Sequence, residues 1–179
     1  MAFMTSSYDN LQENNFGALP KGNYEVIITT AKEQTSKNGS DSIHLALTVR
    51  NDLDQALPNT NGKYHNRLIF VDFWKDKQTG QYKFDQLQYV LNAVKIPAGT
   101  SFNTPEDFLK ALLNKPTNVY VTVESDEYQG ESKERNRVAP WNFHETKFPQ
   151  VNHVAKATNN DPFANNSKPV DITDADLPF

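Results

Sequence analysis

The segment from Asn23 to Arg50 restricts the fold more than any other part of the chain. It holds two runs of strand-forming residues, separated by the turn signal Ser36-Lys37-Asn38-Gly39. In the second run, aliphatic side chains occupy every second position, at Ile43, Leu45, Leu47 and Val49. A period of two is typical of a strand with one buried face. These residues predict a long β-hairpin over 23–50, so the domain must be built around a β-sheet.

Residues 65–74 predict a third strand. One face carries Ile69, Val71 and Phe73, and the other face carries Leu68, Phe70 and Trp74 beside Asp72. Because both faces are mainly apolar, we expect this strand to be covered on both sides, by the core and by a second part of the structure.

A helical pattern follows. Apolar residues recur at spacings of three and four from Phe84 to Val94, which predicts a helix that ends before Pro97. Thr104-Pro105 is a typical start of a second helix. Residues 119–123 and 135–143 then predict two more strands, and Pro140 indicates an edge or a bulge in the last one.

The order is thus three strands, a helical connection and two strands. It predicts an all-β core with a helical insertion, arranged as a five-stranded OB-fold barrel, and it excludes a doubly wound sheet. The 179 residues suit one domain with extensions. We expect a flexible segment over 1–19, the OB-fold domain over 20–147 and a disordered C-terminal tail over 148–179, where apolar periodicity is absent.

Composition argues against catalysis. The chain has no cysteine, which excludes disulfides, zinc ribbons and thiol nucleophiles. Its four histidines lie in separate elements, and no P-loop, Rossmann or nucleophile-elbow motif occurs. We expect no enzyme activity, no cofactor and no metal. Because neither a long apolar run nor a secretory signal is present, we also expect no membrane contact and a cytoplasmic location.

Basic and aromatic residues are interleaved in two stretches, although the formal net charge is −4. Proteins that bind single-stranded nucleic acid without sequence preference combine cations that follow the phosphates with rings that stack on bases. The candidate DNA-binding residues are Lys63, Tyr64, Arg67, Phe70, Trp74, Lys75, Lys77, Tyr82, Arg135, Arg137 and Trp141. The alternative, that the rings fill the core, is favoured for Phe73 and stays open for Phe70, Trp74 and Trp141. Tyr64 and Tyr82 lie beside loops, which favours contact with a ligand.

The C-terminus is acidic and ends in three apolar residues. It consists of Asp171, Asp174 and Asp176 followed by Leu177, Pro178 and Phe179. This end resembles the tip of bacterial single-stranded-DNA-binding proteins. The resemblance implies a partner-docking peptide. In it, Phe179 would enter an apolar pocket of a replication or recombination protein, and a basic residue of that protein would contact the terminal carboxylate. The alternative is an ordinary acidic tail.

The body resembles a second group, the small single-stranded-DNA-binding proteins of phage replication modules, described only as a family of unknown function. The matching stretches are 19–26, 35–39, the helical pair over 84–113, and the turn at 127–130 with the following 135–138. The resemblance implies an OB-like fold and a protein that coats DNA in the host cytoplasm. The helical insertion departs from the cellular proteins, so their tetrameric assembly is not carried over and a homo-oligomer is left open.

These patterns favour sequence-independent binding and protection of single-stranded DNA in phage replication or recombination. Host or phage proteins would be recruited through the tip. The alternative is a protein-interaction adaptor of a phage replisome, whose barrel does not bind DNA.

Overall fold

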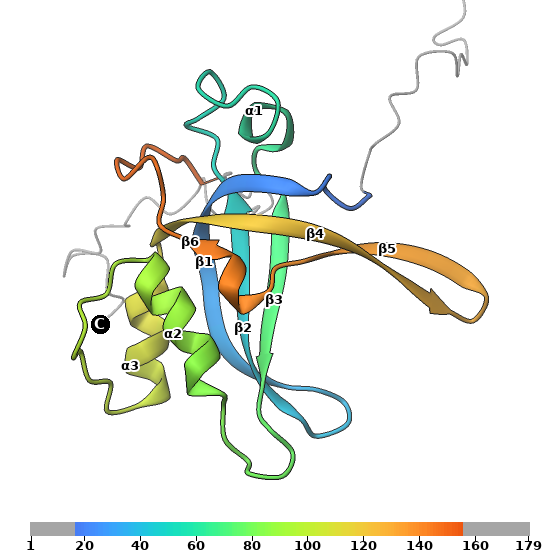
Figure 1. Cartoon of the computed structure of the whole chain (residues 1–179), viewed down its shortest axis with the longest axis vertical. Coiled ribbons are helices and arrows are strands. Elements are labelled where there is room, and N and C mark those ends of the chain that lie inside the picture. Colours follow the sequence, from blue (N-terminus) through green and yellow to red (C-terminus); the bar gives the residue numbers. More distant parts are fainter. Residues whose placement is uncertain (1–16, 156–179) are drawn as a thin grey trace, which may run out of the picture.

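The computed structural model describes residues 17–155, and Figure 1 shows their arrangement. The strands within this range are β1 (Gly22–Thr35), β2 (Asp41–Val49), β3 (Leu68–Trp74), β4 (Pro116–Tyr128), β5 (Glu131–Arg137) and β6 (Phe143–His144). The helices are α1 (Asn61–Tyr64), α2 (Phe84–Ala93), α3 (Pro105–Leu112) and the 3₁₀ helix η1 (Pro140–Asn142). No helix in the described range is long and apolar enough to cross a bilayer.

The strands form one antiparallel sheet in the order β3-β2-β1-β4-β5, with β6 paired to β4 beside this path. The prediction of five strands was wrong, because the expected last strand over 135–143 is divided. Pro140 lacks an amide hydrogen and cannot continue a ladder, and it opens η1 between β5 and β6 instead. The helical connection between the third and fourth strands is confirmed, since α2 and α3 lie there.

The hairpin predicted over 23–50 is confirmed as β1 and β2, which pair from Val26 opposite Val49 to Thr35 opposite Asp41. One irregularity interrupts the register at Thr29. The Thr29 hydroxyl donates to the carbonyl oxygen of Ala46 at 3.1 Å, and it compensates there for the interrupted ladder.

The core lies between the inner face of the sheet and the two longer helices. The aliphatic residues of β2 at alternate positions are buried, together with Leu87 and Val90 of α2 and Phe108 and Leu112 of α3. At the start of α3, the Thr104 hydroxyl accepts a hydrogen bond from the Asp107 amide at 3.2 Å, as expected for an N-cap. Figure 1 shows α2 and α3 lying together on one side of the sheet.

Strand β3 is covered on one face only. Ile69, Val71 and Phe73 are buried, whereas Leu68, Phe70 and Trp74 are about half exposed. The prediction that both faces would be covered was wrong, because no other segment of residues 17–155 packs over the second face. An apolar row on an exposed strand therefore requires an explanation other than core packing.

Strands β4 and β5 extend beyond the rest of the sheet as a two-stranded arm, seen clearly in Figure 1. Gln129 and Gly130 turn the chain at its end, with φ angles of 53° and 80°. Two successive positive φ angles are the geometry of a type I′ turn, whose twist matches that of the flanking strands. The side chains of this arm are almost all exposed, and the base of the arm carries Arg135 and Arg137.

The chain on both sides of the expected domain, 20–147, is also held by hydrogen bonds. Leu19 is buried, and its amide and carbonyl groups each bond the Asn136 side chain at 2.8 Å. Residues 146–154, which we name the C-terminal strap, lie against the end of β2. There the fully buried Arg50 donates to the carbonyl oxygens of Phe148 at 2.7 Å and Gln150 at 2.8 Å.

Candidate functional site

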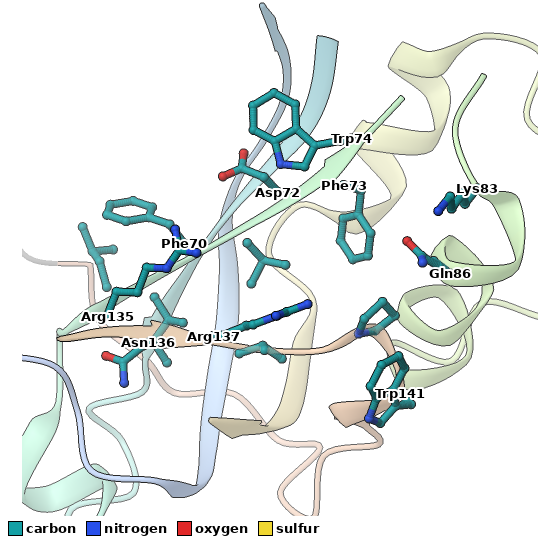
Figure 2. Close-up of a pocket in the computed structure, with 15 residues that line it drawn as sticks. Phe70, Asp72, Phe73, Trp74, Lys83, Gln86, Arg135, Asn136, Arg137 and Trp141 are labelled. Atoms are coloured by element: carbon teal, nitrogen blue, oxygen red, sulfur yellow. The ribbon is translucent and has the colours of Figure 1, made fainter. Parts of the chain in front are cut away.

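An open groove with a volume of about 730 Å³ lies between β3 and β5. These strands are the two ends of the sheet path, and they approach each other without forming a ladder. The groove is lined by residues 68–74 of β3, by Lys83 and Gln86 beside α2, and by 135–138, Pro140 and Trp141. Figure 2 shows these side chains converging from β3, β5, η1 and α2.

Aromatic rings form one part of the groove. Phe70 is 56% exposed, Trp74 47% and Trp141 60%. Strand alternation places Phe70 and Trp74 outward because Val71 and Phe73 point into the core. Trp141 stands outward because the 3₁₀ turn at Pro140 lifts the chain out of the sheet. None of these three rings therefore fills the core, the alternative that the sequence left open.

The ring of Phe70 packs against a side chain of the neighbouring strand β2. His44 on the neighbouring strand stacks on it, with 5.4 Å between ring centroids and 25° between planes. Asp72 holds His44 in turn, through a contact of 2.8 Å between Oδ1 and Nδ1. Gln34 donates to the same Asp72 oxygen at 3.1 Å. Phe70 is thus a ring held in place and presented to solvent.

Two guanidinium groups form the opposite part of the groove. Arg135 and Arg137 lie on the same face of β5, two residues apart, and both line the hollow. Figure 2 shows Arg135 extending toward Phe70. Arg137 Nη1 donates to Glu124 Oε1 at 2.7 Å, and Arg135 Nε donates to Asp126 Oδ2 at 2.8 Å. Both arginines remain more than half exposed.

This arrangement can hold an unpaired nucleic-acid strand. Exposed ring faces can stack on bases, and guanidinium groups can donate paired hydrogen bonds to phosphate. A flat ring and a planar cation both tolerate every base, so the chemistry of the groove carries no evident sequence preference. Of the residues that the sequence indicated, the groove brings together Phe70, Trp74, Arg135, Arg137 and Trp141.

Residues 6–169 match the protein family described as "Protein of unknown function (DUF669)". The chain belongs to this family. A search of curated proteins finds no match. Among solved structures, the chain is similar to yeast RPA bound to ssDNA, with 10% sequence identity and a TM-score of 0.29, over 77% of this chain and 83% of that chain. The family description names no activity, so the chemistry of the groove is the basis for a functional proposal.

The remaining candidate DNA-binding residues of this chain lie outside the groove. They are Lys63, Tyr64, Arg67, Lys75, Lys77 and Tyr82, in or near α1 and the turn after β3. Lys63 lies over the Tyr64 ring at 5.4 Å from its centroid, and Arg67 donates to the carbonyl oxygen of Gly17. Lys75 pairs with Asp41 at 3.1 Å. Lys77 is exposed in the turn.

Tyr64 and Tyr82, which we expected to contact a ligand, are packed against the core. Tyr64 meets the Tyr24 ring edge-on at 6.2 Å. The Tyr82 hydroxyl donates to Glu33 at 2.8 Å, and burial together with this carboxylate raises the pKa of Tyr82. Burial also raises the pKa of Tyr24 to about 12. Tyr24 and Tyr82 therefore act as neutral structural donors, Tyr24 to the carbonyl oxygen of Pro20 at 2.8 Å and Tyr82 to Glu33.

Sequence analysis missed Leu68, Lys83 and Gln86 as groove residues. Leu68 shares its strand face with Phe70 and Trp74, so the strand period alone could have included it. Lys83 and Gln86 lie at the N-terminus of α2. This end of the helix reaches the groove because α2 packs beside η1. No local pattern reports that contact. The predicted docking tip, from Asp171 to Phe179, lies outside the described residues.

Proposed function

We propose that this chain binds and protects single-stranded DNA without sequence preference, through the groove between β3 and β5. The observation that carries the proposal is the exposed row of β3, where Phe70 and Trp74 stand on a strand face that nothing in residues 17–155 covers. Arg135 and Arg137 lie across the groove from this row. Exposed aromatic residues opposite cations are the combination that unpaired bases and their phosphates require.

We further propose that the five strands of the sheet path form a partly open OB-type barrel. The order β3-β2-β1-β4-β5, with helices between β3 and β4, agrees with that plan, and the groove lies where β3 and β5 would close it. Each stacked base contributes about 1–3 kcal/mol to binding, so three rings supply a substantial part of the affinity. In this proposal the protein acts by binding alone and performs no chemistry.

The proposed setting is phage DNA replication or recombination in the host cytoplasm. The C-terminal tip would recruit host or phage replication proteins, with Phe179 and its carboxylate as the anchor. The acidic residues of the tip support this role, because they keep a short apolar peptide accessible in water until it meets a protein pocket lined by basic side chains.

The test is a titration of the full chain with oligo-dT of about 30 nucleotides, monitored by tryptophan fluorescence and repeated over a range of salt concentrations. We expect quenching of Trp74 and Trp141 and an affinity that falls with salt, because phosphate contacts release counterions. Replacing Arg135 and Arg137 together by Gln should flatten the salt slope by about 0.7 for each lost phosphate contact. Lys133→Gln, which removes one positive charge from the same strand outside the groove, is the control for each single replacement, Arg135→Gln or Arg137→Gln.

A chain that neither quenches nor binds dT at low salt would contradict the proposal. It would favour the alternative function, a protein-interaction adaptor that uses the same exposed rings to hold a protein partner.

A further inference from the structure

The groove arginines do not face the solvent as isolated cations. The register of the arm places Glu124 on β4 opposite Arg135 on β5, and the Glu124 side chain contacts both Arg135 and Arg137. One carboxylate oxygen, Oε1, accepts from Arg137 Nη1 at 2.7 Å. The other, Oε2, lies 3.8 Å from Arg135 Nη2. Asp126 contacts the far side of Arg135 at 2.8 Å.

These contacts make the arm a ladder of alternating charge. Along it stand Arg137, Glu124, Arg135 and Asp126, two cations and two anions. The four side chains together carry no net formal charge, although only the two arginines are among the residues that line the groove. A phosphate that approaches either arginine also approaches a carboxylate that carries the same sign as itself.

We infer that Glu124 weakens the binding of the DNA strand, because its carboxylate repels the phosphates that the groove arginines hold. This inference rests on the proposed function and identifies what limits the strength of that same site. Each guanidinium has several N–H donors, so an arginine can hold Glu124 and a phosphate at once. The two anions then lie close together and repel each other, which weakens binding and lowers its dependence on salt.

Glu124 is the more informative of the two acids, because it contacts both arginines and is less exposed. Its side chain is 35% exposed, compared with 52% for Asp126. Replacing Glu124 by Gln removes the negative charge but retains a carbonyl oxygen that accepts from Arg137. The variant therefore changes the electrostatics of the groove while the hydrogen bond that orients Arg137 can persist.

The experiment compares Glu124→Gln with Glu131→Gln in the full chain, using dT of about 30 nucleotides as the probe. Glu131 lies on β5 opposite Tyr128 at the tip of the arm, so the control removes the same charge from the same hairpin, outside the groove. We expect Glu124→Gln to bind about three- to tenfold more tightly at low salt, with a salt slope steeper by about 0.7. The control should change affinity less than about twofold.

Equal changes in dT affinity in the two variants would overturn the inference, because the change in net charge alone would then explain the effect of Glu124→Gln. Weaker binding by Glu124→Gln would also overturn it, since the carboxylate would then help binding by orienting the arginines. In both cases the wild-type chain binds dT and the proposed function stands. A wild-type chain that does not bind dT would overturn the proposed function itself.

Discussion

The direction of single side chains on β3 decides what the groove can do. Phe73 and Trp74 are neighbours in sequence, yet Phe73 is 5% exposed and Trp74 47%. The pleat of the strand sends one ring into the core, where it packs against Phe143, and the other ring into the groove. Aromatic composition alone does not distinguish these roles. The alternation of buried partners along the strand does.

Replacing Trp74 by Ala should weaken binding of dT by about 1–3 kcal/mol, because one stacked base loses its platform. The fold should persist, since the side chain is half exposed. Fluorescence-independent measurements such as calorimetry are needed, because the variant removes one reporter. Tyr128→Ala is the control, an exposed ring on the tip of the arm outside the groove. A stable Trp74→Ala protein with wild-type affinity would exclude stacking at this position.

His153 in the C-terminal strap predicts a pH dependence of stability. Its Nδ1 accepts the Asn51 amide at 3.1 Å, which requires the neutral ring. Burial lowers the pKa of His153 from its ordinary value of 6.5, and the Arg50 charge lowers it further, while Asp52 opposes the shift. Below pH 6.5 the unfolded chain therefore binds more protons than the folded chain.

The free energy of unfolding should thus be fully retained above about pH 6.5 and should fall as the pH drops below this value. Urea denaturation at a series of pH values between about 8 and 5 measures the effect. His153→Gln keeps a polar side chain without a titrating ring, so its stability should vary less over this interval. An unchanged pH profile in the variant would assign the acid sensitivity to other groups.

At the scale of elements, the C-terminal strap completes the polar contacts of two buried charges. Arg50 would lose two carbonyl acceptors without the strap, and Glu25 would lose the Thr146 hydroxyl at 2.6 Å. Burial raises the pKa of Asp52, but hydrogen bonds from Arg50 and the Asn152 amide outweigh it and hold the pKa of Asp52 below its usual range. The strap is therefore part of the domain energetically.

A chain that ends at residue 155 should melt within about 2 °C of the full chain, since it keeps all these bonds. A chain that ends at residue 147 leaves buried Arg50 short of two acceptors, at a cost of about 3 kcal/mol. That cost corresponds to a melting temperature lower by about 6–12 °C, measurable by circular dichroism. Equal melting of both truncated chains would mean that water replaces the strap without loss.

At the scale of the whole molecule, the proposed function divides between a groove that binds DNA and a terminus that binds proteins. Phe179→Ala should abolish capture of replication proteins in a pull-down and leave dT affinity unchanged, because the two sites use different residues. Phe163→Ala is the matched control, a phenylalanine that also follows a proline in the tail. Partners retained by Phe179→Ala would return the tip to the role of an ordinary acidic tail.

The sequence by itself determined the elements that depend on short-range patterns. The β-hairpin over 23–50 follows from strand periodicity and an Asn-Gly turn, and the two longer helices follow from apolar spacing and the Thr104 cap. It also placed Phe70, Trp74, Arg135, Arg137 and Trp141 among the candidate residues. All five line the groove. They were candidates because stacking on bases and contact with phosphates would require aromatic rings and cations, and local composition reveals these residue types.

The tertiary structure decided which of these residues meet. Tyr64 and Tyr82 lie beside loops in the sequence, but they pack against the core, where Tyr64 meets the Tyr24 ring and Tyr82 bonds Glu33. The strap shows no apolar period, and it is held instead by hydrogen bonds that Arg50 donates to carbonyl oxygens about 100 positions further along the chain. The groove joins β3 to β5, which are far apart in sequence and share no hydrogen-bond ladder. Contacts of this kind depend on the closure of the whole sheet, and no window of sequence contains them.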